Sequence, residues 1–414
     1  MEIGRRTVLK GLAATGALAA AGPWVRVASA QAPDAILVGA TLALTGPFSD
    51  EVAPFKKFME LWAEQINAQG GIMLREYGKR IPVKFIVYDD TSKPPVSLAS
   101  YEKLVTVDKV HLLLGPYSSP ITTAASTVAD KHKIPFIALE ANSTAIFNRG
   151  FQWVVGVIDD GPKWSWHYFD MLKAEGKAKT IGFIIQETGH TKEVGAGSIA
   201  KAQEIGLKVV VQETAPAPAT EFTPVITKMK AADPDIVYIS GFPAFNVAFY
   251  KQALEQGLAP REFHVIHHGS AFRKPTGDAR ANLVTGENYW MPGVKGGGDV
   301  ALFEDLLTKT GLSVADYPWV SIHMFGLETM KAALEKAGTV DREKVLKALK
   351  ELDIKTISGR LRFQKKGEAL HPEAQGQGTL NPFPTQIQDG KYVTLWPSQY
   401  ATGKHIYPRP GSTR

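Results

Sequence analysis

The sequence predicts an α/β protein of two lobes, each a doubly wound parallel sheet with helices on both faces. Short apolar runs alternate with helical stretches, and this alternation occurs twice, with a break near residues 150–160. The length of 414 residues agrees, because it exceeds one compact core and suits two or three domains. A hydrophobic content of 44% and a charged content of 21% are those of a soluble globular protein.

The first run opens with an apolar strand over 36–44, which ends in the turn residues Thr45-Gly46-Pro47. Large apolar residues then recur at helical spacing from Phe55 to Ile66, which predicts one buried helix face, and glycines end this helix. The other elements expected in this run are strands over 81–88, 110–114 and 134–139, and helices over 95–107 and from Pro120.

The second run repeats this alternation with elements of similar length. We expect strands over 180–186, 207–213, 235–240 and 263–266, and helices over 162–175, 192–205, 222–232 and 244–256. After residue 290 the pattern predicts helices over 299–309, 319–337 and 341–351, and short strands over 360–363, 385–389 and 392–396. Residues 364–384 are rich in Gly, Pro and Gln, which predicts an irregular surface loop.

The first thirty residues are typical of an export signal. A charged head with Arg5 and Arg6 precedes the small apolar residues 11–22, and Ala28-Ser29-Ala30 is a cleavage site of the A-x-A type. The adjacent arginines resemble a twin-arginine signal. The alternative is a membrane anchor, but the apolar run is short of the ~20 residues that span a bilayer. We therefore expect a periplasmic protein whose signal peptide, residues 1–30, is removed after Ala30.

Charge and cysteine content exclude several classes of function. Residues 1–30 hold four of the 47 basic residues and one of the 41 acidic ones, so residues 31–414 carry a net charge of only +3. This balance, without a long basic run, gives no electrostatic support for a nucleic-acid partner. The absence of cysteine excludes disulfides, thiol catalysis, cysteine-ligated zinc and iron–sulfur clusters.

Several segments, taken in order, resemble the substrate-binding proteins of branched-chain amino-acid-type ABC transporters. They are VGATLALTGPFS (38–49), INAQGGI (66–72), YDDTSKP (88–94), HLLLGPYSSP (111–120), IPFIALEANST (134–144), PDIVYISGFPAFNVAFYKQALEQG (234–257), and ISGRLRFQ and QIQDGKYVTLWP in the C-terminal part. The resemblance covers nearly all of residues 34–400. It implies the type I periplasmic-binding-protein fold, with two lobes joined by three crossovers. Lobe 1 would comprise 34–157 and 292–357, lobe 2 would comprise 158–291 and 358–400, and 401–414 would form a C-terminal tail.

Ligands of open α/β sheets bind beyond the carboxyl ends of the strands, which points to the loops after residues 44, 114, 139, 186, 240 and 267. In one of these loops Ser118 and Ser119 precede Pro120, which suits a first helical turn. The N–H groups of a helix N-terminus and two hydroxyls form an anion site. The resemblance implies that this loop holds the ligand carboxylate. The alternative is that Ser119 only caps the helix.

The resemblance also implies further contacts to the ligand. It places the loop that follows residue 139 at the ligand head group, and it places Phe242 over the ligand, although a core aromatic is the alternative there. The aromatic residue that relatives carry before a glycine is missing, because Val194 precedes Gly195. The complete set of candidate ligand-binding residues is Ser49, Tyr117, Ser118, Ser119, Ala141, Asn142, Ser143, Glu187, Phe242 and His268.

His268 is the most informative departure from the family pattern. Relatives that bind amino acids have an acidic residue at this position, which pairs with the ligand ammonium. A histidine would instead meet a second carboxylate, a carbonyl or an aromatic ring, and Glu140 or Glu187 would remain as ammonium partners. If His268 faces a carboxylate, affinity should be strongest at low pH. The alternative is that His268 points away from the cleft.

Other patterns imitate sites that we do not expect. Residues 195–200 match a dinucleotide fingerprint, but the first glycine lies nine residues after the strand end at Gln186. The histidines of 264–268 would not converge on a metal, because strand geometry places His267 opposite the other two. Asp89-Asp90 is predicted to cap a loop or stabilise a lobe, and most of the tryptophans are predicted to pack in cores and interfaces. No cofactor, no metal and no enzymatic activity are expected.

The leading hypothesis is an exported, monomeric receptor of an ABC importer. It would close two lobes on a small carboxylate-bearing ligand, namely an amino acid, an aromatic or aliphatic acid, or an amide, and deliver it to a membrane permease. One alternative is a ligand-binding sensory protein that feeds a receptor, because the same fold serves both purposes. The other alternative is a periplasmic NAD-dependent enzyme. Such an enzyme would need a cofactor fingerprint or a convergent acid–base set, and the sequence shows neither.

Overall fold

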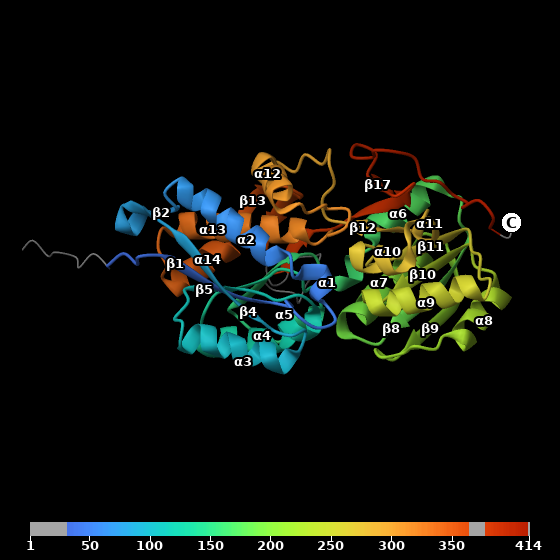
Figure 1. The fold of residues 1–414 in the computed structure, drawn as a ribbon, viewed down its shortest axis with the longest axis horizontal. Helices are drawn as coiled ribbons and strands as arrows, with labels where there is room; N and C mark the ends of the chain where they lie inside the picture. The colour runs from blue at the N-terminus through green and yellow to red at the C-terminus, as the bar shows by residue number, and fades with distance from the viewer. Residues whose placement is uncertain (1–30, 364–376, 413–414) are drawn as a thin grey trace, which may run out of the picture.

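The computed structural model describes residues 31–363 and 377–412, which form two α/β lobes side by side (Figure 1). The signal peptide predicted over 1–30 lies outside the described residues, as does most of the loop predicted over 364–384. None of the helices in these two ranges has the length and apolar character that crossing a membrane requires.

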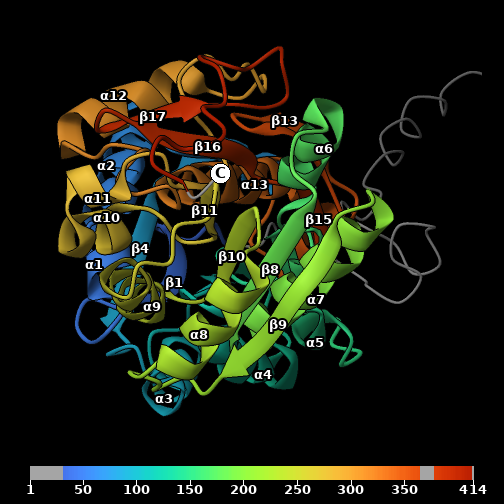
Figure 2. The ribbon, with the colours of Figure 1, turned by 90° about the vertical axis from the view of Figure 1, so that its right-hand side faces the viewer.

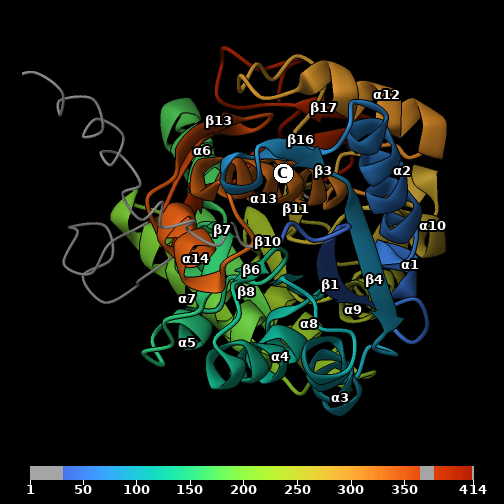
Figure 3. The same ribbon diagram turned by 90° about the vertical axis from the view of Figure 1, so that its left-hand side faces the viewer.

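The first lobe contains a six-stranded parallel sheet in the order β15-β7-β6-β5-β1-β4. Helices α3 (Pro94–Thr106) and α4 (Ser119–His132) cover one face, and α2 (Phe55–Ala68) and α13 (Val320–Ala337) cover the other (Figures 1 and 3). The strands are β1 (Ile36–Leu42), β4 (Val83–Asp89), β5 (Leu112–Leu114), β6 (Phe136–Ala138), β7 (Val154–Ile158) and β15 (Gln377–Leu380).

The second lobe contains a seven-stranded sheet in the order β17-β16-β12-β11-β10-β8-β9, with β16 and β17 antiparallel at one edge. Helices α8 (Thr223–Ala232) and α9 (Pro243–Glu255) lie on one face, and α6 (Trp166–Glu175) and α7 (Gly189–Glu204) on the other (Figure 2). The strands are β8 (Thr180–Gln186), β9 (Lys208–Ala215), β10 (Ile236–Ser240), β11 (Glu262–Val265), β12 (Thr285–Asn288), β16 (Phe383–Gln388) and β17 (Lys391–Thr394).

Two hairpins and several short helices complete the described chain. One hairpin pairs β2 (Ile72–Leu74) with β3 (Lys79–Ile81), and the other pairs β13 (Asp353–Thr356) with β14 (Gly359–Arg362). The remaining helices are α1 (Ser49–Val52), η1 (Arg75–Tyr77), α5 (Thr144–Phe147), η2 (Gly161–Lys163), α10 (Ser270–Thr276), α11 (Asp278–Ala281), α12 (Val300–Thr310) and α14 (Arg342–Lys350).

The fold of two lobes with predominantly parallel sheets confirms the predicted class. The chain passes between the sheets after β7, after β12 and between β15 and β16. The last crossing differs from the expected boundary at residues 357–358, because β15 pairs with β7 in the first sheet. Residues 377–380 therefore belong to the first sheet, although the family resemblance implied that they lie in lobe 2.

The C-terminal residues 401–412 run along the second lobe. The His405 side chain is buried between Glu175 and Glu262, with Nδ1 2.9 Å from Glu175 Oε2 and Nε2 2.5 Å from Glu262 Oε2. These two carboxylates raise the pKa of His405 to about 9 against the opposing effect of burial. The Arg409 backbone N–H adds a hydrogen bond of 2.9 Å to the Arg261 carbonyl.

Candidate functional site

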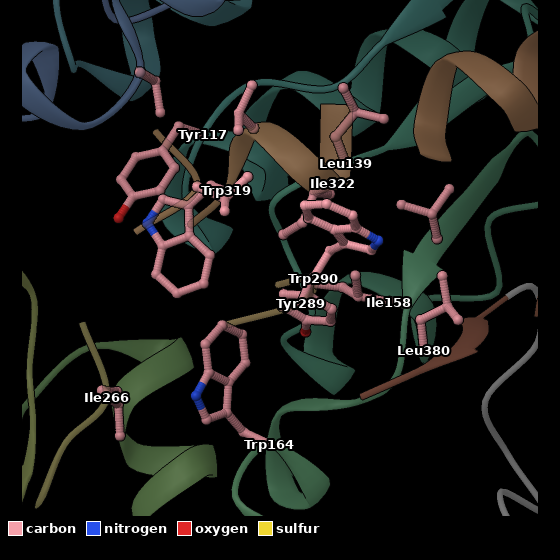
Figure 4. Close-up of a cluster of buried hydrophobic side chains, with 14 of the residues drawn as sticks. Tyr117, Leu139, Ile158, Trp164, Ile266, Tyr289, Trp290, Trp319, Ile322 and Leu380 are labelled. Atoms are coloured by element: carbon pink, nitrogen blue, oxygen red, sulfur yellow. The ribbon is translucent and has the colours of Figure 1, made fainter. Parts of the chain in front are cut away.

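A cavity of about 310 Å³ lies between the lobes, where the carboxyl ends of strands from both sheets meet. Residues that follow β5, β6, β10 and β11 form much of its wall, together with the starts of α7 and α13. Figure 4 shows that Tyr117, Trp164, Trp319 and Ile322, which come from separate parts of the chain, lie in one cluster. The lining residues are Tyr117, Ser118, Ser119, Glu140, Asn142, Ile158, Trp164, His190, Phe242, His267, Trp319 and Ile322.

Ser118 supplies a buried hydroxyl at the N-terminus of α4. It is the residue before the first helical turn, and its backbone has a φ of 78°, a left-handed conformation that is uncommon for a residue with a side chain. The residue is 2% exposed, and Oγ has no hydrogen-bond partner among the described residues. Because the first N–H groups of a helix also lack partners within it, this end of the cavity offers donors to an anion.

Ser119 connects the start of α4 to the loop that follows β6. It is the first helical residue rather than the cap, and its Oγ accepts hydrogen bonds from the backbone N–H groups of Asn142 and Ser143, both at 3.2 Å. The hydroxyl hydrogen of Ser119 stays available to an acceptor in the cavity, because Oγ acts as acceptor in both contacts. The bridge also fixes the position of the β6 loop relative to α4.

Aromatic rings from both lobes enclose the rest of the cavity. Phe242 and His267 stack with ring centroids 5.3 Å apart and planes 7° apart, and Trp164 lies 5.5 Å from Trp319. His190, at the start of α7, lies 5.2 Å from Trp164. These rings suit an apolar or aromatic ligand body, which can gain contact area and ring packing there.

The two imidazoles in this wall are neutral at physiological pH. Burial lowers the pKa of His190 well below its usual value and lowers the pKa of His267 to about 4. The Nδ1 atom of His267 lies 2.8 Å from the Gly241 carbonyl oxygen, which makes that nitrogen the protonated donor. Neither ring therefore adds a positive charge to the cavity.

Glu51 lies behind the wall and organises two of its side chains. The Tyr117 hydroxyl donates to Glu51 Oε2 at 3.2 Å, and the Trp319 indole N–H donates to the same oxygen at 2.6 Å. Figure 4 shows the Tyr117 hydroxyl and the Trp319 nitrogen on the same side of the cluster. Burial raises the pKa of Glu51 to about 7, against the lowering effect of these two hydrogen bonds.

Glu140 follows β6 and lines the cavity itself. Its Oε2 lies 3.2 Å from Nε2 of His323, a residue of α13, and the two side chains are 2% and 1% exposed. Its Oε1 has no hydrogen-bond partner among the described residues. Burial raises the pKa of Glu140, and His323 opposes this rise.

Contacts between the lobes close the cavity. Nδ1 of His190 lies 2.8 Å from the Asn142 side-chain oxygen. Glu193 of α7 accepts hydrogen bonds from the Ser143 hydroxyl and from the Thr144 backbone N–H, each at 2.7 Å. At another edge the rings of Phe48 and Phe242 lie 5.2 Å apart. The lobes are thus closed over a small, largely aromatic space.

A family model described as periplasmic binding protein matches residues 35–378, which is most of the chain. The chain belongs to the periplasmic binding protein family. It is also 24% identical to the Leu/Ile/Val-binding protein homolog 7 of Brucella abortus, over 93% of this chain and 97% of that protein.

Solved structures show the same fold. A leucine binding protein from Thermotoga maritima matches 87% of this periplasmic binding protein and 98% of its own chain, with a TM-score of 0.73 and 16% identity. An ABC transporter solute binding protein from R. palustris in complex with 4-hydroxybenzoate matches 90% of this chain and 97% of its own chain, with a TM-score of 0.71 and 20% identity. These relatives are solute-binding proteins and not enzymes, as the sequence predicts.

Half of the predicted ligand-binding residues line the cavity of this periplasmic binding protein, and half do not. Those in its wall are Tyr117, Ser118, Ser119, Asn142 and Phe242. Ser49 donates to the Gly46 carbonyl, Ser143 donates to Glu193, and Ala141 is buried beside the cavity without lining it. Glu187 is exposed and accepts a hydrogen bond from Thr214 at 3.1 Å.

His268 lies outside the cavity, and the neighbouring His267 lines it instead. The His268 ring is fully buried in the second lobe, with Nε2 2.8 Å from Thr385 Oγ1 and the Tyr392 ring 5.0 Å away. Burial lowers its pKa to about 3. His268 therefore points away from the cleft, as the alternative interpretation stated. A pH-dependent contact between His268 and a ligand carboxylate is not expected.

Several cavity residues were not among the predicted ones. Trp164 and Trp319 are buried in the hydrophobic core, as expected of the tryptophans, and they also form cavity walls. His190, which lies five residues before Gly195, lines the cavity, whereas Val194 is fully buried. Their position along the chain could have identified Trp164 and His190 as cavity residues, because both follow the carboxyl end of a strand.

The structure also accounts for the patterns that imitate other sites. Gly195 and Gly197 lie inside α7, and a Cβ on Gly197 would come within 2.0 Å of the Pro162 carbonyl oxygen, so close packing requires this glycine. Asp89 Oδ1 accepts N–H bonds from Leu44 and Thr45, which confirms the loop-stabilising role. In the described ranges, no group of three or more His, Asp or Glu residues is arranged to hold a metal ion.

Proposed function

We propose that this periplasmic binding protein captures a small carboxylate-bearing solute between its lobes and presents it to the membrane permease of an ABC importer. Ser118 carries the proposal, because its buried hydroxyl lines the cavity beside the N-terminus of α4 and has no partner among the described residues. A carboxylate oxygen would supply the missing acceptor and would also meet the helix N–H groups.

The rest of the cavity supports a compact organic acid. Its walls are mostly aromatic and aliphatic, as in many sites that bind a small organic molecule. Two structural neighbours are a leucine binding protein and a solute binding protein in complex with 4-hydroxybenzoate, and both of these small molecules carry a carboxylate on an apolar body. These neighbours support a ligand of this general class.

Export is part of the same proposal. The family is periplasmic, and a leader over residues 1–30 that is removed after Ala30 would bring the chain to the compartment where such a receptor works. The near-balanced charge of residues 31–414 suits a receptor that binds a small solute and gives no reason to invoke a nucleic acid.

Isothermal titration calorimetry with matched acids and amides tests the carboxylate. L-leucine or 4-hydroxybenzoate should bind the exported protein, and the acid that binds should do so at least tenfold more tightly than its own amide, leucinamide or 4-hydroxybenzamide. Ser118→Ala should weaken binding of the acid about tenfold, because a charge-assisted hydrogen bond contributes ~1.5–3 kcal/mol.

Ser126→Ala is the matched control for this experiment. Ser126 is also fully buried on α4, but its hydroxyl contacts Arg149 and does not line the cavity. This variant should keep the affinity of the parent protein. Equal binding of acids and amides, or unchanged affinity in Ser118→Ala, would contradict the proposal.

A further inference from the structure

The side chain of Glu193 joins the two lobes at a point outside the cavity. Glu193 stands on α7 of the second lobe and accepts hydrogen bonds from the Ser143 hydroxyl and the Thr144 backbone N–H of the first lobe, each at 2.7 Å. Figure 2 shows α5, which begins at Thr144, close to α7. The described lining residues of the cavity include none of these three. A ligand that occupies the cavity is therefore separated from this contact.

Both hydrogen bonds of the Glu193 side chain cross between the lobes. Among the residues that the structure describes, this carboxylate makes no other hydrogen bond and no ion pair. Thr144 is the first residue of α5, so its N–H has no partner within that helix. Hydrogen bonds to a charged acceptor are about twice as strong as neutral ones. The contact therefore stabilises the closed form, and it is lost when the lobes separate.

The loop that Glu193 holds also forms part of the cavity wall. Asn142 and Ser143 donate their backbone N–H groups to Oγ of Ser119, both at 3.2 Å. Asn142 and Ser119 line the cavity, and the Asn142 side-chain oxygen lies 2.8 Å from Nδ1 of His190. His190 precedes Glu193 on α7 by about one helical turn. Closure of the lobes at Glu193 thus holds the same loop that shapes this end of the cavity.

Gly161 gives the Glu193 side chain room to reach the first lobe. It lies in η2, in the segment that crosses to the second lobe after β7, and its N–H donates to the Asn142 carbonyl at 2.9 Å. A Cβ on this glycine would lie 3.3 Å from both Cβ and Oε2 of Glu193, which is closer than an ordinary contact. The carboxylate is therefore packed against the crossing segment as well as bonded to the first lobe.

We infer that Glu193, with Ser143 and Thr144, is a closure latch that sets the affinity for every ligand by one common factor. The apparent affinity of a protein that binds in its closed form is the intrinsic affinity multiplied by the fraction closed. The latch changes only that fraction, so its removal should weaken all ligands alike. This inference rests on the proposed function for its ligands and adds a residue that acts without touching them.

The common factor can be tested with the acid that binds, L-leucine or 4-hydroxybenzoate, and with the amide of that acid. In Glu193→Ala both affinities should fall about tenfold, by factors that agree within about twofold, because two charge-assisted hydrogen bonds of the closed form are lost. Ser118→Ala should instead weaken the acid more than its amide, because it changes the cavity. Stopped-flow kinetics should show faster dissociation from Glu193→Ala, since the latch forms after the ligand has entered.

Three further variants serve as controls, and urea unfolding without ligand checks that each one folds. Glu204→Ala removes a carboxylate of the same helix that pairs with Lys201 at 2.8 Å, and it should leave both affinities unchanged. Glu193→Gln keeps an acceptor without the charge and should give a smaller loss that is again equal for acid and amide. Ser143→Ala together with Glu193→Ala should cost less than the sum of the two single changes, because these side chains contact each other.

The outcomes distinguish the latch from the proposed function. Unchanged affinity in Glu193→Ala overturns the inference, and so do unequal losses for acid and amide, because Glu193 would then take part in recognising the ligand. If neither acid binds the parent protein, the proposed function fails and hydrogen exchange without ligand decides on the latch. Peptides that contain the Thr144 N–H should exchange faster in Glu193→Ala than in Glu204→Ala, and equal rates overturn the inference. If Glu193→Ala does not fold, Glu193→Gln provides the same comparisons.

Discussion

Replacing Glu51 by Gln should make the protein more stable at alkaline pH and leave the pH-independent part of its stability unchanged. Burial raises the pKa of Glu51 from 4.5 to about 7 in the folded state. Stability from this group is therefore fully present below pH 4.5 and is lost as pH rises through 7, because the unfolded chain releases the proton first. A rise in pKa of this size corresponds to about 3 kcal/mol of unfolding free energy.

The variant keeps the local hydrogen bonds but removes the titration. A glutamine carbonyl oxygen accepts from the Tyr117 hydroxyl and the Trp319 N–H as the carboxyl oxygen does. The difference in unfolding free energy between Glu51→Gln and the parent protein should grow by about 3 kcal/mol between pH 4.5 and pH 8.5.

Urea unfolding at one-unit intervals of pH measures this difference directly. Glu64→Gln, an exposed carboxylate on α2, serves as control and should give curves parallel to those of the parent protein. A difference for Glu51→Gln that stays constant from pH 4.5 to pH 8.5 would refute the reasoning, because it would mean that Glu51 titrates alike in the folded and unfolded chain.

Two other predictions concern the ends of the chain. His405 has a folded-state pKa of about 9 against 6.5 for the free side chain, so its stabilising effect is present below pH 6.5 and disappears as pH rises through 9. His405→Gln should cost about 3 kcal/mol at pH 6 and little at pH 9.5, and an equal cost at both pH values in urea unfolding would rule out the charge as the cause. The exported protein should begin at Gln31, and changing Arg5 and Arg6 to Lys should block its export; N-terminal sequencing and cell fractionation check both, and an intact Met1 would contradict the cleavage.

Strongly periodic segments could be predicted from the sequence, whereas short polar ones could not. The apolar face of α2 buries Phe55, Phe58 and Trp62 to within 1% of full burial, as their helical spacing predicts. The hairpin strand Lys79–Ile81 and the edge strand β15 carry no such pattern. Their strand geometry depends on pairing with partners that only the folded protein brings close, so local sequence holds little information about them.

The candidate site also contains some residues that could be predicted from the sequence and others that could not. Ser118 and Ser119 could be found because a turn, two hydroxyls and a proline directly follow a strand. His267 and His268 could not be assigned, since a shift of one residue at a strand end moves a side chain to the other face. Trp319 reaches the cavity from the position just before α13, far along the chain, and the side chain of Glu140 contacts His323 on that helix. Contacts of this kind arise from tertiary packing rather than from local sequence.

The late crossing between β15 and β16 has a consequence for synthesis of the chain. Until residues 377–380 emerge from the ribosome, β7 forms an open edge of the first sheet, and all five of its residues are buried in the finished fold. An apolar edge of this kind readily pairs with another chain. A nascent or truncated protein that ends before residue 377 should therefore depend on a chaperone to avoid aggregation, even though most of both lobes has already been made.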